Sequence, residues 1–142
     1  AEAVLYHQAK TQGLADHLLV DSAGTHAQTH SGEAPDPRAK SVAVQRGYTQ
    51  IAQQRARSVE TEDFDTFDLI VAMDRQNYSY LNKMCPESHR AKLRLFLEFA
   101  PELSMDEVPD PYYGDLAGFE KTLELCESGV QGLLRTESTK FR

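Results

Sequence analysis

Asp110 lies between two prolines in the segment Val108-Pro109-Asp110-Pro111. Each proline fixes its own φ angle and restricts the residue before it, so the backbone that aims this carboxyl group is stiff. A carboxyl group held in this way can give or take a proton during a reaction, which makes Asp110 a candidate general acid or base. An ordinary turn aspartate is the alternative, because Asp and Pro are both common in turns.

The cysteines and histidines indicate neither a metal site nor a disulfide framework. Cys85 and Cys126 are far apart in sequence, and the five histidines show no ligand spacing. Cys126 falls on the apolar stripe of an expected helix and Cys85 at a helix end, so both are expected to be structural. Two unpaired cysteines fit a reducing compartment, and we expect a cytoplasmic protein.

Composition bounds the possible partners. The 142 residues fit one domain, and 15 basic against 22 acidic residues give a net charge of −7. With no basic stripe, nucleic acid is not expected as a partner. The longest apolar runs, such as residues 69–73, fall far short of the roughly 20 residues needed to cross a bilayer, so no membrane association is expected.

Capping signals predict the helices. Asp36 precedes Pro37, Asp74 precedes a polar segment that ends before Pro86, and Asp115 precedes a long apolar stripe. Gly13 and Gly47 are candidate helix ends. The expected helices cover residues 1–12, 36–47, 74–85 and 115 onwards, with a short helical turn at 61–67; the stripe of the last helix comprises Phe119, Leu123, Cys126, Val130 and Leu133.

Short apolar runs between these helices predict buried strands at residues 18–20, 68–73 and 93–99. Strands that alternate with helices are typical of a parallel sheet covered on both faces. The predicted fold is therefore a three-layer α/β/α sandwich with a central parallel sheet, formed by residues 1–142 as a single domain. The first segment is a helix with no strand before it, which predicts that an N-terminal strand and turn are missing from this sequence.

Several motifs resemble those of the low-molecular-weight protein-tyrosine-phosphatase family. They occur in the family's order along nearly the whole chain, and the most specific pairing is the segment from Val108 to Gly114 with Ala72-Met73-Asp74. The others are Ala1 to Val4, Asp21 to Thr25, Asp36 to Ala39, Arg55 to Arg57 and Asp63-Phe64. Family members often carry a histidine where Gln54 stands here.

The resemblance implies an enzyme that hydrolyses phosphotyrosine in proteins through a cysteinyl-phosphate intermediate, without a metal or organic cofactor. Asp110 would protonate the leaving phenolate and later activate water. Tyr112 and Tyr113 would wall the slot for the substrate's aromatic ring, or they are surface tyrosines. The Ser22 hydroxyl would support the phosphate loop, or it is a turn serine. Arg57 and Asp74 are expected to be structural.

In this family the phosphate loop has the pattern Cys, five residues, Arg, and it precedes the Ala1 motif. This sequence contains no such pattern, because Ala91 and Gly132 follow the two cysteines at the required spacing. The alternative is therefore a non-catalytic phosphoprotein-binding domain or a degenerate homologue. Within the family, the sequence also leaves open an arsenate reductase or an arginine phosphatase, although Ala72-Met73-Asp74 lacks the reductase cysteine and the tyrosines favour an aromatic substrate.

Overall fold

A computed structural model describes residues 1–14, 18–25, 32–109 and 116–137. Within these ranges the strands are β1 (Ile70–Ala72) and β2 (Leu93–Leu95), which pair in parallel with Ile70 opposite Leu93. The α-helices are α1 (Glu2–Thr11), α2 (Pro37–Gln45), α3 (Asp63–Thr66), α4 (Arg75–Met84) and α5 (Leu116–Glu137); the 3₁₀ helices are η3 (Thr49–Gln53), η4 (Glu87–Lys92), η5 (Phe96–Phe99) and η6 (Pro101–Leu103).

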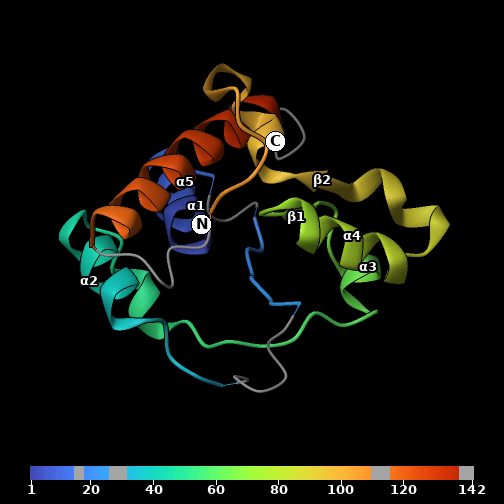
Figure 1. The fold of residues 1–142 in the computed structure, drawn as a ribbon, viewed down its shortest axis with the longest axis horizontal. Helices are drawn as coiled ribbons and strands as arrows, with labels where there is room; N and C mark the ends of the chain where they lie inside the picture. Colours follow the sequence, from blue (N-terminus) through green and yellow to red (C-terminus); the bar gives the residue numbers. More distant parts are fainter. Residues whose placement is uncertain (15–17, 26–31, 110–115, 138–142) are drawn as a thin grey trace.

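The strands separate two groups of buried side chains. Val71 packs against a cluster formed mainly by α1, α2, α5 and η5, whereas Ile70 and Ala72 belong with the cluster that α3 and α4 cover. Successive side chains of a strand point to opposite faces, so this sheet is covered on both sides. In Figure 1, α1 and α5 lie on one side of the strands and α3 and α4 on the other, which confirms the three-layer α/β/α prediction.

Two of the three predicted caps form as expected, and the third, at Asp115, lies outside the described residues. The Asp36 carboxylate accepts a hydrogen bond from the Arg38 N–H at 2.8 Å, and the Asp74 carboxylate accepts one from the Asn77 N–H at 2.7 Å. Gly13 and Gly47 have φ angles of +74° and +92°. Each follows the last residue of its helix by two positions and makes the paired hydrogen bonds of a Schellman ending, so both glycines occupy conformations that disfavour a side chain.

Two strand predictions were wrong in whole or in part. Leu18 to Val20 forms no strand: none of the described backbone hydrogen bonds joins it to a neighbouring strand, and Leu19 is 75% exposed. The second error concerns residues 96–99, which form η5 after β2 has ended. The Glu98 carboxylate accepts the Leu95 N–H at 3.0 Å, and this local bond begins a helical turn where the ladder would have continued.

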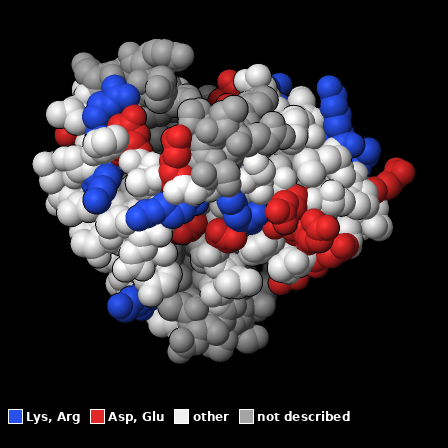
Figure 2. Space-filling view, turned by 90° about the horizontal axis from the view of Figure 1, so that it is seen from below, with Lys and Arg blue, Asp and Glu red and all other residues white. Residues whose placement is uncertain are grey.

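Helix α5 packs closely on η5, and the predicted apolar stripe is confirmed, because all five of its residues are buried. Among the described residues, no helix combines the length and apolar character needed to span a bilayer. On the face shown in Figure 2, Lys and Arg side chains lie among Asp and Glu side chains and form no continuous basic stripe.

Candidate active site

Ser22 lies beside the first turn of α1. Its hydroxyl donates a hydrogen bond to the Glu2 carboxylate at 2.7 Å, and its N–H donates to Asp21 at 2.8 Å. The residue was predicted to follow a strand, but none of the described backbone hydrogen bonds pairs the segment before it with a strand. Ser22 is held by these side-chain contacts, and a parallel bridge between Gly24 and Ser58 fixes the backbone two residues later.

Arg57 fixes the Ser22 segment to the chain that leads into α3. Its guanidinium binds Asp21 at 3.1 Å and binds both oxygens of Asp63 at 3.0 and 3.1 Å. The hydrogen bond to Asp63 raises the pKa of Arg57. Burial opposes ionisation of Asp63, but bonds from Arg57 and the Glu60 N–H outweigh it and lower the pKa of that carboxyl group. Arg57 is thus a structural clamp in this geometry.

Hydrogen bonds join the same segment to the chain at Arg57 and to the first turn of α4, which follows β1. The Gly24 N–H donates to the Arg57 carbonyl at 2.8 Å, and Asn77 in the first turn of α4 donates its amide to the Thr25 hydroxyl at 3.0 Å. Asp74 caps that turn, as predicted. The motif from Asp21 to Thr25 therefore meets the carboxyl end of β1, which is where ligands bind in open parallel sheets.

The segment that leads to Asp110 starts at the same edge of the sheet. The Val108 N–H donates to the Met73 carbonyl, directly after β1, at 2.8 Å, and the Val108 side chain is buried. On the other side, the Thr122 hydroxyl of α5 donates to the Pro109 carbonyl at 3.4 Å. Both bonds anchor the chain immediately before Asp110. The candidate residues Asp110, Tyr112 and Tyr113 themselves lie outside the described residues.

An open groove of about 190 Å³ adjoins Ser22. Arg55 and Gln54 contribute to its wall, and the other lining residues are Glu33, Ala34, Pro35 and Ala56. The exposed Arg55 guanidinium donates to the Ala52 and Gln54 carbonyls, which keeps a positive charge at this edge. Gln54, which replaces the family's frequent histidine, donates its amide to Gln50 at 2.9 Å. Close to Ser22, the groove therefore carries one positive charge, from Arg55, and one negative charge, from Glu33.

The two cysteines are structural in this geometry. Cys126 lies in the cluster between α5 and α1, and Cys85 ends α4 in the other cluster, with exposed fractions of 5% and 4%. Neither is a candidate nucleophile. In the part of the chain that the structure describes, no three His, Cys, Asp or Glu side chains are grouped so that they could hold a metal ion.

Glu2 is the partner of Ser22 that sequence reasoning missed. Its motif, Ala1 to Val4, carries part of the family resemblance, but the sequence gives its carboxylate no role beyond a helix start. An acidic residue in the first turn of a helix is common because it complements the helix dipole, so nothing in the local sequence pointed to Ser22 as its partner.

Comparison with known proteins gives the same fold and family. Residues 1–141 match the family described as low molecular weight phosphotyrosine protein phosphatase. The chain is 38% identical to a low molecular weight protein-tyrosine-phosphatase of Streptomyces coelicolor, covering 94% of this chain and 82% of that protein. A fission yeast (Schizosaccharomyces pombe) low molecular weight phosphotyrosine protein phosphatase is 40% identical, covering 84% of this chain and 75% of its own length.

A crystal structure of a protein tyrosine phosphatase from Entamoeba histolytica superimposes with a TM-score of 0.90 at 35% identity, covering 98% of this chain and 88% of the other. The fold and these relatives place the chain among the α/β phosphatases. The chain belongs to the low molecular weight phosphotyrosine protein phosphatase family.

Proposed function

We propose that the protein hydrolyses phosphotyrosine in proteins, with residues 1–142 as one catalytic domain and Asp110 as the general acid and base. The observation that carries the proposal is the hydrogen bond from the Val108 N–H to the Met73 carbonyl at 2.8 Å. It fixes the chain leading to Asp110 at the end of β1, the same edge that Asn77 ties to Thr25 in the segment of Ser22. The relatives, which are named as tyrosine phosphatases, support the same chemistry.

The reaction proceeds in two displacements at phosphorus. A cysteine thiolate attacks the phosphoryl group, the bond from phosphorus to the tyrosine oxygen breaks, and Asp110 gives its proton to the leaving oxygen. Asp110 then takes a proton from water as the water oxygen attacks phosphorus and the bond to sulfur breaks, which releases phosphate and restores the thiolate. Proton transfer of this kind contributes roughly 10²–10⁴-fold to the rate.

The nucleophile belongs to the family's Cys-x₅-Arg loop, which residues 1–142 do not contain. The proposal therefore applies to a chain that carries this loop ahead of residue 1. Backbone N–H groups of such a loop form an anion site at a helix N-terminus and keep the cysteine ionised. In that chain, the Ser22 hydroxyl supports the loop, and Tyr112 and Tyr113 wall the ring of the substrate.

We further propose a cytoplasmic enzyme that acts on phosphotyrosine-containing proteins. The two cysteines that the structure describes are free, which fits a reducing compartment. An aromatic wall selects phosphotyrosine over the shorter phosphoserine, because only the longer side chain reaches a phosphate at the base of a slot while its ring contacts the wall.

The test compares phosphotyrosyl and phosphoseryl peptides of the same sequence, with phosphate release as the readout. A chain carrying the loop should hydrolyse the phosphotyrosyl peptide with a kcat/KM at least about tenfold higher, and Tyr112→Ala with Tyr113→Ala should narrow the difference. Equal rates on both peptides would contradict the substrate class. Binding of the phosphotyrosyl peptide without turnover would instead identify a phosphoprotein-binding domain.

A further inference from the structure

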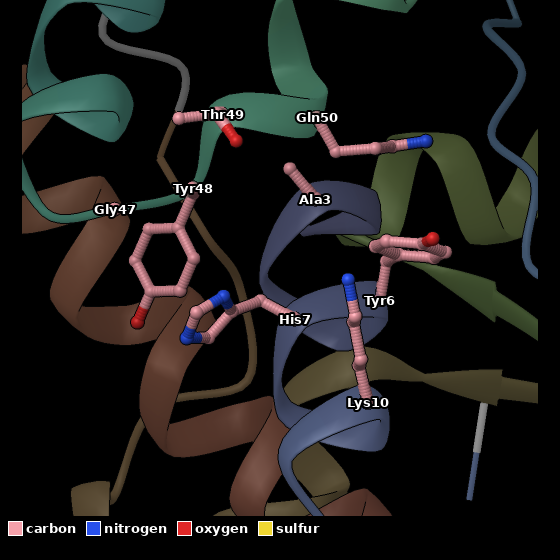
Figure 3. A pocket seen from close by; sticks show the side chains of 8 residues that line it. All are labelled: Ala3, Tyr6, His7, Lys10, Gly47, Tyr48, Thr49 and Gln50. Atoms are coloured by element: carbon pink, nitrogen blue, oxygen red, sulfur yellow. The ribbon is translucent and has the colours of Figure 1, made fainter.

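A second, smaller pocket lies on α1. It has a volume of about 80 Å³ and shares no lining residue with the groove beside Ser22. The walls come from one side of α1 and from the chain that follows α2 (Figure 3); the lining residues are Ala3, Tyr6, His7, Lys10, Gly47, Tyr48, Thr49 and Gln50. A single water needs about 10–15 Å³ of such space, so this pocket has room for one small polyatomic ion.

The lining is cationic in a protein whose net charge is −7. Lys10 and His7 come from successive turns of α1, and no Asp or Glu lines the pocket. Lys10 makes no ion pair with a residue that the structure describes. In Figure 3 its side chain extends along the helix towards Gln50, with the Tyr6 ring beside it. Among the described residues, no carboxylate therefore competes with an anion for this ammonium group.

The wall opposite α1 is fixed by bonds that point away from the pocket. Gly47 and Tyr48 close α2 by their N–H bonds to Val44 and Ala43, at 3.0 Å each. The buried Tyr48 ring meets the edge of the His7 ring, with 5.2 Å between ring centroids, and its hydroxyl donates to Glu127 of α5. Burial, together with the bond to Glu127, raises the pKa of Tyr48 to about 12, so the phenol stays neutral.

Glu127 is itself paired with Arg46 at 2.8 Å, so the carboxylate that Tyr48 contacts is already compensated. On the pocket side, Thr49 and Gln50 supply polar groups without charge. The Gln50 carbonyl oxygen accepts the Gln54 amide at 2.9 Å, which leaves the Gln50 amide nitrogen as a donor. The pocket thus combines the ammonium group of Lys10 with the His7 imidazole, the Thr49 hydroxyl and the Gln50 amide.

We propose that this pocket is a binding site for a small tetrahedral oxyanion of the phosphate class, held by Lys10, His7, Thr49 and Gln50. Several hydrogen-bond donors around one ammonium group match the several acceptor oxygens of such an ion, and charge-assisted hydrogen bonds are the stronger ones. The pocket shares no lining residue with the groove beside Ser22, so its occupancy does not require turnover.

The test is an NMR titration of the protein with sodium phosphate at constant ionic strength, against sodium chloride as the blank. The His7 ring and the Thr49 and Gln50 amides should shift with phosphate and not with chloride. Lys10→Gln should raise the dissociation constant for phosphate, measured from these shifts, by roughly fivefold. This is the upper end of the effect expected from removing an exposed charge. The matched control is Lys83→Gln, because Lys83 occupies the same last-turn position in the equally long helix α4.

The Ser22 amide reports separately on the other groove, and its response to phosphate should not change in Lys10→Gln. Thr49→Val is a second variant, which should also weaken binding. Equal effects of Lys10→Gln and Lys83→Gln, or equal shifts with phosphate and chloride, would show general ionic attraction and overturn the proposal. Titration with phenylphosphonate distinguishes a free oxyanion from an aryl phosphoryl group as the ligand. Tighter binding than phosphate assigns the site to an aryl phosphoryl group beside Tyr6. Equal or weaker binding assigns it to the free ion.

Discussion

Ser22 and Glu2 are joined by a hydrogen bond of 2.7 Å, in which the hydroxyl is the donor and the carboxylate the acceptor. A hydroxyl has one hydrogen to give and two lone pairs to accept with. Because Glu2 takes the hydrogen, the oxygen of Ser22 is left to accept a backbone N–H. Glu2 thus orients Ser22 as an acceptor beside the first turn of α1, where we expect the family's phosphate loop to end.

Ser22→Ala should therefore affect catalysis more than stability. In a chain carrying the loop, we expect kcat/KM for an aryl phosphate to fall by roughly three- to tenfold, since one supporting hydrogen bond is lost. The free energy of unfolding should change by less than about 1 kcal/mol, because the contact with Glu2 is exposed. Ser41→Ala, an exposed change on α2, is the control for both measurements. A large loss of stability with unchanged kcat/KM would assign Ser22 to the fold alone.

Arg57→Gln should destabilise the protein in a pH-dependent way. The pKa of Asp63 is lowered in the folded state, so this pair contributes stability above the ordinary carboxyl pKa of about 3.9 and loses it as pH falls through the lower folded value. Urea unfolding at pH 7 should show a loss of about 1–2 kcal/mol for this half-buried pair, and the difference from wild type should shrink below pH 4.

The matched control for Arg57→Gln is Arg90→Gln, which removes the same charge from an exposed residue of η4. It should cost less than about 0.5 kcal/mol at both pH values. If the loss of unfolding free energy in Arg57→Gln were the same at pH 7 and pH 3, the ion pair with Asp63 would not be its cause.

Gly132→Ala should destabilise the protein strongly, although Ala normally stabilises a helix relative to Gly. A Cβ atom at Gly132 would lie 1.6 Å from the Phe99 carbonyl oxygen, and a backbone atom cannot move aside cheaply. We expect a loss of about 3 kcal/mol or more in the free energy of unfolding, and a smaller loss for Gly129→Ala, which meets the Phe96 ring. Gln131→Ala, on the exposed side of α5, should be neutral. A neutral Gly132→Ala would contradict the close packing of α5 on η5.

Local signals in the sequence predicted the helices well. Asp36 and Asp74 cap their helices as expected, and Gly13 and Gly47 end theirs, because each of these bonds lies within a few residues. The apolar stripe around Cys126 also followed from spacing alone. These features depend on one helix and its immediate flanks, so a single sequence contains what is needed to find them.

The strands and the site depend on distant partners and were harder to predict. Residues 18–20 have the composition of a strand but pair with no strand in the described part of the chain, and η5 forms because the Glu98 carboxylate accepts the N–H of Leu95. The Ser22 partner Glu2 is 20 residues away. No local pattern indicated the pocket around Lys10, because its walls come from α1 and from the chain after α2, which are far apart in the sequence.

The most direct test of the central claim is the dependence of Asp110→Asn on the leaving group, measured in a chain that carries the Cys-x₅-Arg loop. Phenolate, with a pKa near 10, leaves slowly without a proton, so kcat/KM for phenyl phosphate should fall by roughly 10²-fold or more. A nitrophenyl ester has a less basic leaving group, and its loss in kcat/KM should be smaller. Its kcat should stay depressed, because the same carboxylate activates water in the second step. An equal loss of kcat/KM across the series would contradict the account and leave Asp110 only a role in shaping its loop.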